Sequence, residues 1–218
     1  MNTPTKITFS RIIAIVIMII TLVVLYFVKL ANPSFMIPNI GNSGVNWLYF
    51  ALFIFFVLAS FTDFLDGYLA RKNNQVTNLG KFLDPVADKL LVNSMVIFLV
   101  VKPAYVPEGQ IDFSLWCAIL LIARDIVVDA LRFIAAQKGV VIAANIFGKA
   151  KTVLEMIAVS LVLLNSWPFI YFDANWPVTI ADVFVYLCTF ASVMSGIIYV
   201  VKYRYVLKEK KEDGTESK

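Results

Sequence analysis

The amino-acid sequence predicts an all-α, polytopic membrane protein with six transmembrane helices. Its 218 residues are 60% hydrophobic and only 16% charged, and the mean hydropathy is +0.81. Soluble domains are typically about 45–50% apolar and about 25% charged. Six apolar stretches, each near the roughly 20 residues that a spanning helix needs, follow one another along the chain. This composition argues against nucleic-acid-binding modules, secreted disulfide scaffolds and disordered proteins.

The predicted spans follow the chain in order and leave no room for a separate soluble domain. The first is longer than the apolar core of about 7–15 residues found in signal peptides, so we expect it to remain as a membrane anchor. The second continues as a polar helical extension through Arg71. We predict one transmembrane catalytic domain over residues 1–204 and a charged cytoplasmic tail over 205–218. The six spans are Ile12–Val28, Val45–Thr62, Phe82–Val101, Phe113–Gln137, Met156–Phe172 and Val183–Val201.

The distribution of Lys and Arg predicts the orientation of these spans. Of the 19 basic residues, 14 fall in the termini and in the second and fourth connections, whereas only Lys29 and Lys102 fall on the opposite side. Because positive charge concentrates in cytoplasmic loops, we expect both termini in the cytoplasm. The net charge of +4 suits contact with anionic headgroups of the cell membrane and does not indicate a nucleic-acid partner.

Two absences limit the possible chemistry. The chain has no histidine, which excludes histidine-based triads and histidine-ligated zinc. Its two cysteines, Cys117 and Cys188, lie in apolar stretches without CxxC spacing, so we expect buried core thiols rather than a disulfide or a thiolate metal site.

Acidic residues gather around the second predicted cytoplasmic connection. Ionisable residues within spans are costly and are therefore functional candidates. Residues 63–88 have the spacing D-x2-D-G-x2-A-R-x8-G-x3-D-x3-D. On a helix the first five fixed positions share one face, and the last two aspartates lie one turn apart at the expected start of the next helix, where Pro85 suits the first turn. A short connection over 72–81 would then bring four carboxylates together: Asp63, Asp66, Asp84 and Asp88.

Four carboxylates in an apolar environment need compensating cations, and two divalent ions would balance them. Oxygen ligands without His or Cys favour a hard cation, Mg2+ or alternatively Mn2+. Gly67 and Ala70 leave room on the same face for a phosphorylated group. A two-metal site beside a basic residue is typical of phosphoryl transfer. The alternative is simple pairing of the acids with neighbouring bases: Arg71, Lys72, Lys81 and Lys89.

The pattern over residues 63–88 resembles the signature of the CDP-alcohol phosphotransferases, integral membrane enzymes of phospholipid synthesis. The resemblance implies the CDP-alcohol phosphotransferase fold, a homodimer and two metal ions held by the four aspartates. It also implies that Asp88 is the base that takes the proton of the attacking hydroxyl. The residues that the resemblance places around the CDP donor are Thr8, Asp63, Asp66, Gly67, Ala70, Arg71 and Thr77.

A set of cations in the second half of the chain favours an anionic acceptor such as a phosphate ester. Two of them are arginines eight residues apart, about two helical turns, so both can point along one face. Local pairing of each arginine with a neighbouring aspartate, Asp125 or Asp129, is the alternative. The predicted acceptor-binding set is Arg124, Arg132, Lys149 and Lys151.

Segments around these cations resemble a narrower group, the bacterial phosphatidylglycerophosphate synthases. The resemblance is carried by Lys6–Arg11, Ile122–Asp125, Lys138–Ala143 and Gly148–Thr152. It implies that CDP-diacylglycerol donates a phosphatidyl group to glycerol 3-phosphate at the cytoplasmic face. The sequence departs from this group by an acid at Asp129 and at Glu155. Other acceptors (inositol phosphate, phosphatidylglycerol or serine) and, in another class, a divalent-cation transporter are the alternatives.

Overall fold

The computed structural model describes residues 3–41, 43–72, 78–139, 146–169 and 177–204, with side chains described in these ranges except at 3–4 and 64–82. The predicted tail over 205–218 lies outside the described residues.

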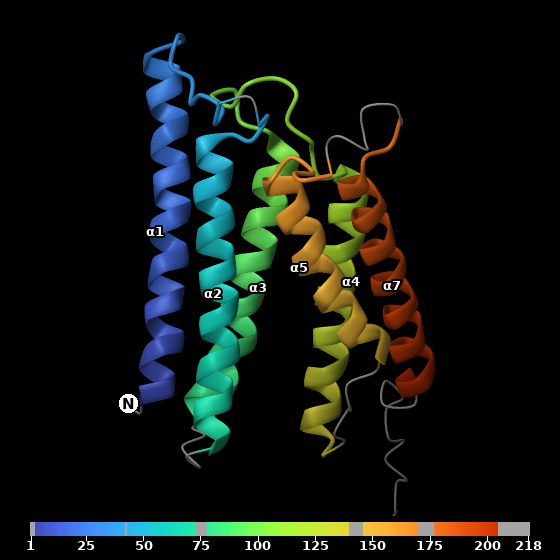
Figure 1. Ribbon diagram of the computed structural model, residues 1–218. Coiled ribbons are helices and arrows are strands. Elements are labelled where there is room, and N and C mark those ends of the chain that lie inside the picture. Colours follow the sequence, from blue (N-terminus) through green and yellow to red (C-terminus); the bar gives the residue numbers. More distant parts are fainter. Residues whose placement is uncertain (1–2, 42, 73–77, 140–145, 170–176, 205–218) are drawn as a thin grey trace, which may run out of the picture.

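The described part of the chain is a bundle of six helices, as predicted (Figure 1). Successive helices run in opposite directions, so the N-terminus and the ends of α2, α4 and α7 lie at one end of the bundle. We call this the inner end, and the opposite end the outer end. The helices are α1 (Thr3–Ala31), α2 (Trp47–Lys72), α3 (Asn78–Val101), α4 (Leu115–Gln137), α5 (Ile146–Leu163) and α7 (Ile180–Tyr203).

Two helices are long and apolar enough to cross a membrane by themselves, over Thr5–Ala31 and Ile180–Tyr203. Helix α2 has a shorter apolar part, Trp47–Asp63, before its polar end. The first helix leaves large apolar side chains exposed, among them Ile17 (57%) and Phe27 (62%). Such exposure is typical of a surface that contacts another apolar medium rather than water.

The predicted position of the fifth span, Met156–Phe172, is wrong. Helix α5 covers Ile146–Leu163, so it begins before the predicted segment and ends inside it. Asn165 and Ser166 have φ angles of +51° and +61°, a backbone conformation that a right-handed helix cannot contain. Hydropathy missed this end because apolar residues continue beyond it.

The predicted start of the third helix is also wrong. Asp84 and Pro85 do not open this helix, because α3 already begins at Asn78. Pro85 lies inside α3, where the carbonyl four residues earlier, at Lys81, loses its usual hydrogen bond. That carbonyl belongs to the first turns of the helix, so the loss affects only its beginning.

The six helices form two groups that share one core at the outer end. Helix α1 packs against α2 and α3, whereas α4 and α5 both pack against α7. Buried side chains such as Met95 of α3 and Val162 of α5 belong to a single apolar cluster that joins the groups. Nearer the inner end, Val128 of α4 and Tyr199 of α7 belong to a separate small cluster. The two groups therefore diverge toward the inner end.

Buried Asn165 ties the loops of the outer end together. Its Oδ1 accepts a hydrogen bond from the backbone N–H of Ile111 at 2.8 Å. Its Nδ2 donates to the carbonyls of Gly44 at 3.1 Å and Gly109 at 3.4 Å. One side chain thus satisfies backbone groups of two other connections, and it is only 5% exposed.

We expect Asn165→Ala to destabilise the protein by about 2 kcal/mol, because buried backbone groups would lose their partners. Thermal unfolding in detergent would measure this loss. Asn32→Ala is the matched control, since Asn32 is exposed and its Oδ1 accepts only the nearby Ser34 hydroxyl among the hydrogen bonds seen for this side chain. Equal stability of the two variants would contradict this role of Asn165.

Candidate functional site

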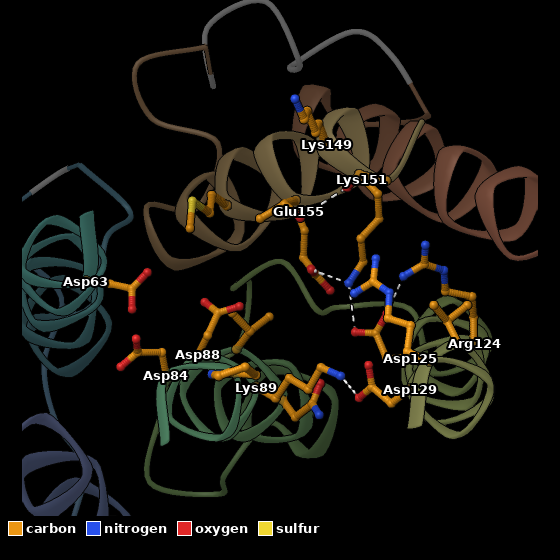
Figure 2. A pocket seen from close by; sticks show the side chains of 18 of the residues that line it. Asp63, Asp84, Asp88, Lys89, Arg124, Asp125, Asp129, Lys149, Lys151 and Glu155 are labelled. Atoms are coloured by element: carbon orange, nitrogen blue, oxygen red, sulfur yellow. Dashed lines mark hydrogen bonds and ion pairs between the residues drawn. The ribbon is translucent and has the colours of Figure 1, made fainter. Parts of the chain in front are cut away.

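A pocket of about 410 Å³ lies between the two groups of helices (Figure 2). Carboxylates from α2 and α3 line one side of the pocket, and cations and further acids from α4 and α5 line the other. The charged residues that line it are Asp63, Asp84, Asp88, Lys89, Arg124, Asp125, Asp129, Arg132, Lys149, Lys151 and Glu155.

Three of the four predicted metal ligands are described, and all three line this pocket. Asp63 comes from α2, and Asp84 and Asp88 come from α3, one turn apart. The side chain of Asp66 lies outside the described part of the structure. Among the described side chains, no three acids or cysteines are close enough to hold a metal ion.

The donor chemistry of this side fits a hard divalent cation. The three described aspartates of the predicted metal site offer only oxygen, and they gather on one side of the pocket (Figure 2). Oxygen-only sets suit Mg2+ and Mn2+ rather than zinc. Asp66 would complete the set that the spacing predicts.

Helix α1 contacts two of the aspartates directly. The Thr8 hydroxyl donates a hydrogen bond to Asp84 Oδ1 at 2.9 Å. The buried Arg11 guanidinium forms an ion pair with Asp63. Thr8 was predicted at the donor site, whereas Arg11 was counted as a cytoplasmic charge and as part of the resemblance over Lys6–Arg11, without a role in the site. Its signal in the sequence was a single cation at the edge of an apolar span.

The remaining predicted donor-site residues are not tested by the geometry. Gly67, Ala70 and Arg71 belong to the last turns of α2, but their side chains lie outside the described part. Thr77 lies outside the described residues altogether. Their contacts with a donor stay predictions.

A buried ionic network links α4 and α5 on the cationic side. Asp125 accepts hydrogen bonds from Arg124 Nη1 and from Lys151 Nζ, both at 2.8 Å. Lys151 also forms an ion pair with Glu155 at 2.6 Å. The side chains of Asp125, Lys151 and Glu155 are only 11%, 7% and 5% exposed. Two cations and two carboxylates therefore balance one another where water has little access.

The other two predicted acceptor residues have different surroundings. Arg132 donates to the hydroxyl of Tyr199 at 3.0 Å, and its Cζ lies 5.2 Å from the centre of that ring. Lys149 is exposed at the edge of the pocket. All four predicted cations thus line one pocket, but only Arg124 and Lys151 are seen paired with carboxylates.

The alternative of local pairing is right for one arginine and wrong for the other. Arg124 pairs with the adjacent Asp125, as that alternative supposed. Asp129 instead forms an ion pair with Lys89 of α3, across the pocket, while Arg132 contacts Tyr199. Sequence spacing on one helix could not reveal these contacts between helices.

Comparison with known proteins agrees with this geometry. The family model described as CDP-alcohol phosphatidyltransferase matches residues 1–204. This chain belongs to the CDP-alcohol phosphatidyltransferase family. The family resemblance carried by the aspartate pattern is confirmed, and so is the prediction that the protein is an enzyme; the cation-transporter alternative is set aside.

Individual relatives of this family share one name. A CDP-diacylglycerol–glycerol-3-phosphate 3-phosphatidyltransferase of Bacillus subtilis is 40% identical over 208 residues, covering 95% of this chain and 97% of the relative. Proteins of the same name from Rickettsia bellii and Mycoplasma genitalium are each 34% identical, covering 91% and 87% of this chain and 93% and 80% of the relatives. The family and the apolar helices together indicate a membrane protein.

Two aspartates of α4, four residues apart, allow the buried network to be tested against a matched control. We expect Asp125→Ala to lower the free energy of unfolding by on the order of 3 kcal/mol, because it leaves two buried cations without their shared acceptor. Asp129→Ala should cost less than about 1 kcal/mol, since the Asp129 side chain is 46% exposed. Thermal unfolding in detergent measures both. A larger loss for Asp129→Ala would contradict the assignment.

Proposed function

We propose that this protein transfers the phosphatidyl group of CDP-diacylglycerol to glycerol 3-phosphate, which gives phosphatidylglycerophosphate and CMP. One observation carries the proposal: a single pocket joins three aspartates of the family pattern to a set of cations suited to an anionic acceptor. The shared name of the relatives from three bacteria supports the same pair of substrates.

On the carboxylate side, Asp63, Asp66, Asp84 and Asp88 would hold two Mg2+ ions, with Mn2+ as an alternative. Bound metal would offset the negative charge of the donor's pyrophosphate during transfer. Thr8 and Arg11 hold two of these carboxylates from α1. Donor contacts would come from Thr8, Asp63, Asp66, Gly67, Ala70, Arg71 and Thr77.

Asp88 is the proposed catalytic base. It lies in the pocket on α3, facing the space shared with the cations of α4 and α5 (Figure 2). In the transfer, the acceptor hydroxyl oxygen bonds to the phosphorus of the phosphatidyl group, and the bond from that phosphorus to the CMP oxygen breaks. Asp88 takes the proton of the hydroxyl.

The phosphate of glycerol 3-phosphate would bind to the cations on the other side of the pocket. Asp125 and Glu155 already balance Arg124 and Lys151. Arg132 and Lys149 therefore supply most of the attraction for an anion, and the other two supply directed N–H donors. Arginine suits this task because its planar fork binds phosphate through two hydrogen bonds.

We further propose six membrane spans with both termini and the active site facing the cytoplasm of the cell, in the cell membrane. The N-terminus, the ends of α2, α4 and α7 and the starts of α3 and α5 lie at the inner end, where the two helix groups diverge (Figure 1). The sequence is rich in Lys and Arg next to these helix ends. A homodimer embedded in the lipid bilayer is proposed from the family resemblance.

The product identifies the acceptor. Purified protein, CDP-diacylglycerol and Mg2+ should release CMP and form phosphatidylglycerophosphate when glycerol 3-phosphate is added. Parallel reactions with inositol phosphate, serine or phosphatidylglycerol should release little CMP. Turnover with one of these, and none with glycerol 3-phosphate, would overturn the proposed acceptor but keep the reaction class.

We expect Asp63→Asn and Asp84→Asn each to reduce turnover at least a hundredfold while the protein still inserts and purifies. Either change removes one negative charge and one ligand, so metal binding weakens. CMP release across a Mg2+ titration measures the effect. Asp112→Asn is the control, because Asp112 lies in an outer-end loop and pairs with Lys102. Near-normal turnover of either pocket variant at ordinary Mg2+ would refute the metal assignment.

Arg132→Ala should raise the KM for glycerol 3-phosphate about tenfold or more, because a charge-assisted contact is lost. The KM for CDP-diacylglycerol should stay nearly unchanged. Arg132→Lys should recover only part of the loss, since the ammonium cannot reproduce the planar fork. Equal increases of both KM values would argue that Arg132 supports the fold rather than the acceptor.

A further inference from the structure

Helix α7 carries two hydroxyl groups that accept hydrogen bonds from arginines of the pocket; Tyr199 itself also lines the pocket. Ser195 and Tyr199 are four residues apart, so they lie on the same face of α7, one turn from each other. Both are buried, with 0% and 1% of their surface exposed. Nothing in the sequence spacing pointed to either residue, because α7 carries no charged residue in its apolar core.

Each hydroxyl holds one arginine of α4. Arg124 Nη2 donates to Ser195 Oγ at 2.7 Å. Arg132 Nη2 donates to the Tyr199 hydroxyl at 3.0 Å, and the Tyr199 ring also contacts the guanidinium at 5.2 Å from its centre. The hydroxyls are neutral acceptors, so they fix the direction of the guanidinium groups without cancelling their charge.

This arrangement directs both guanidinium groups toward the same stretch of α7. Arg124 and Arg132 are eight residues apart, which separates their backbones by about 12 Å along α4. Their anchors on α7 are only four residues apart, about 6 Å along that helix. The two hydroxyls also lie close to one common point, 3.4 Å and 3.8 Å from the position that a Cβ atom at Gly148 would take. Two arginine forks held by neighbouring hydroxyls suit the oxygens of one phosphate group.

Two glycines make room for these contacts. A Cβ atom at Gly196 would lie 2.9 Å from Cγ of Arg124, closer than real Cβ atoms come. A Cβ atom at Gly148 would lie 3.4 Å from Ser195 Oγ and 3.8 Å from the Tyr199 hydroxyl. Helices α4 and α5 therefore both approach α7 closely near the two hydroxyls. In addition, Arg124 Nε is buried and has no hydrogen-bond partner among the described residues, so this N–H is available to donate to a ligand.

We propose that Ser195 and Tyr199 are positioning residues that aim Arg124 and Arg132 at the phosphate of the acceptor. The inference rests on the proposed transfer to glycerol 3-phosphate and adds to it a role for α7. The two hydroxyls act through the arginines, so they govern acceptor binding and leave donor binding alone. Selectivity for a phosphorylated acceptor then depends on three helices, α4, α5 and α7.

Two hydroxyl deletions test the proposal, each with a matched control on the same helix. Tyr199→Phe keeps the ring, and Ser195→Ala removes a single oxygen atom. Each should raise the KM for glycerol 3-phosphate about threefold to tenfold, the effect of losing one hydrogen bond. The kcat and the KM for CDP-diacylglycerol should stay within about twofold. The double variant, with Tyr199→Phe and Ser195→Ala combined, should raise the KM for glycerol 3-phosphate further than either single variant.

The control variants remove a serine or tyrosine hydroxyl of α7 that is not seen bonded to an arginine. Ser192 is buried in α7 with a hydroxyl that has no partner among the described residues, so Ser192→Ala should leave both KM values unchanged. Tyr186 is 53% exposed on the outside of α7, and Tyr186→Phe should behave likewise.

Two results would overturn the proposal. In the first, Tyr199→Phe and Ser195→Ala keep a normal acceptor KM while Arg132→Ala raises it, so the arginine acts without its anchor. In the second, they change both KM values in parallel with a fall in thermal stability, which indicates a purely structural role. Failure of the proposed function would look different: the unaltered protein would form no phosphatidylglycerophosphate from glycerol 3-phosphate.

Discussion

The cost of burying charge between apolar helices is the constraint on which the rest of this structure depends. An unpaired ion away from water is strongly destabilising, so each buried charge needs a partner held at close range. Lys151 shows the solution, since it lies between Asp125 and Glu155 at hydrogen-bond distances. These contacts join α4 to α5, and Arg124 extends them to α7 through Ser195. Electrostatic balance thus fixes how three helices meet.

The two-group architecture follows from where apolar packing continues and where it stops. At the outer end one core joins all the helices, and buried Asn165 ties the loops there. Toward the inner end the groups separate, and their facing surfaces carry carboxylates on one side and cations on the other. Apolar packing at the outer end stabilises the contact between the two groups of helices. The inner end can therefore hold a polar pocket, which contributes little apolar packing of its own.

The pocket divides the reaction between the two groups of helices. Helices α1, α2 and α3 supply the carboxylates of the family pattern with their supports, Thr8 and Arg11. Helices α4, α5 and α7 supply the cations and the groups that orient them. The donor and the acceptor would therefore meet at the boundary between the groups. The ion pair of Lys89 with Asp129 crosses this same boundary and links the two sides.

The sequence by itself predicted the six helices found in the described part of the chain, the aspartate pattern and the family, because hydropathy and residue spacing are local properties of the chain. It also singled out the four cations predicted to bind the acceptor, and the structure places all four in one pocket. Only the tertiary structure decided the contacts between helices: Arg11 with Asp63, Lys89 with Asp129, and Arg132 with Tyr199. Such pairs depend on how each helix is rotated and how far it is shifted against its neighbour. Packing of side chains across the bundle sets that rotation and shift, and no spacing along a single helix contains it.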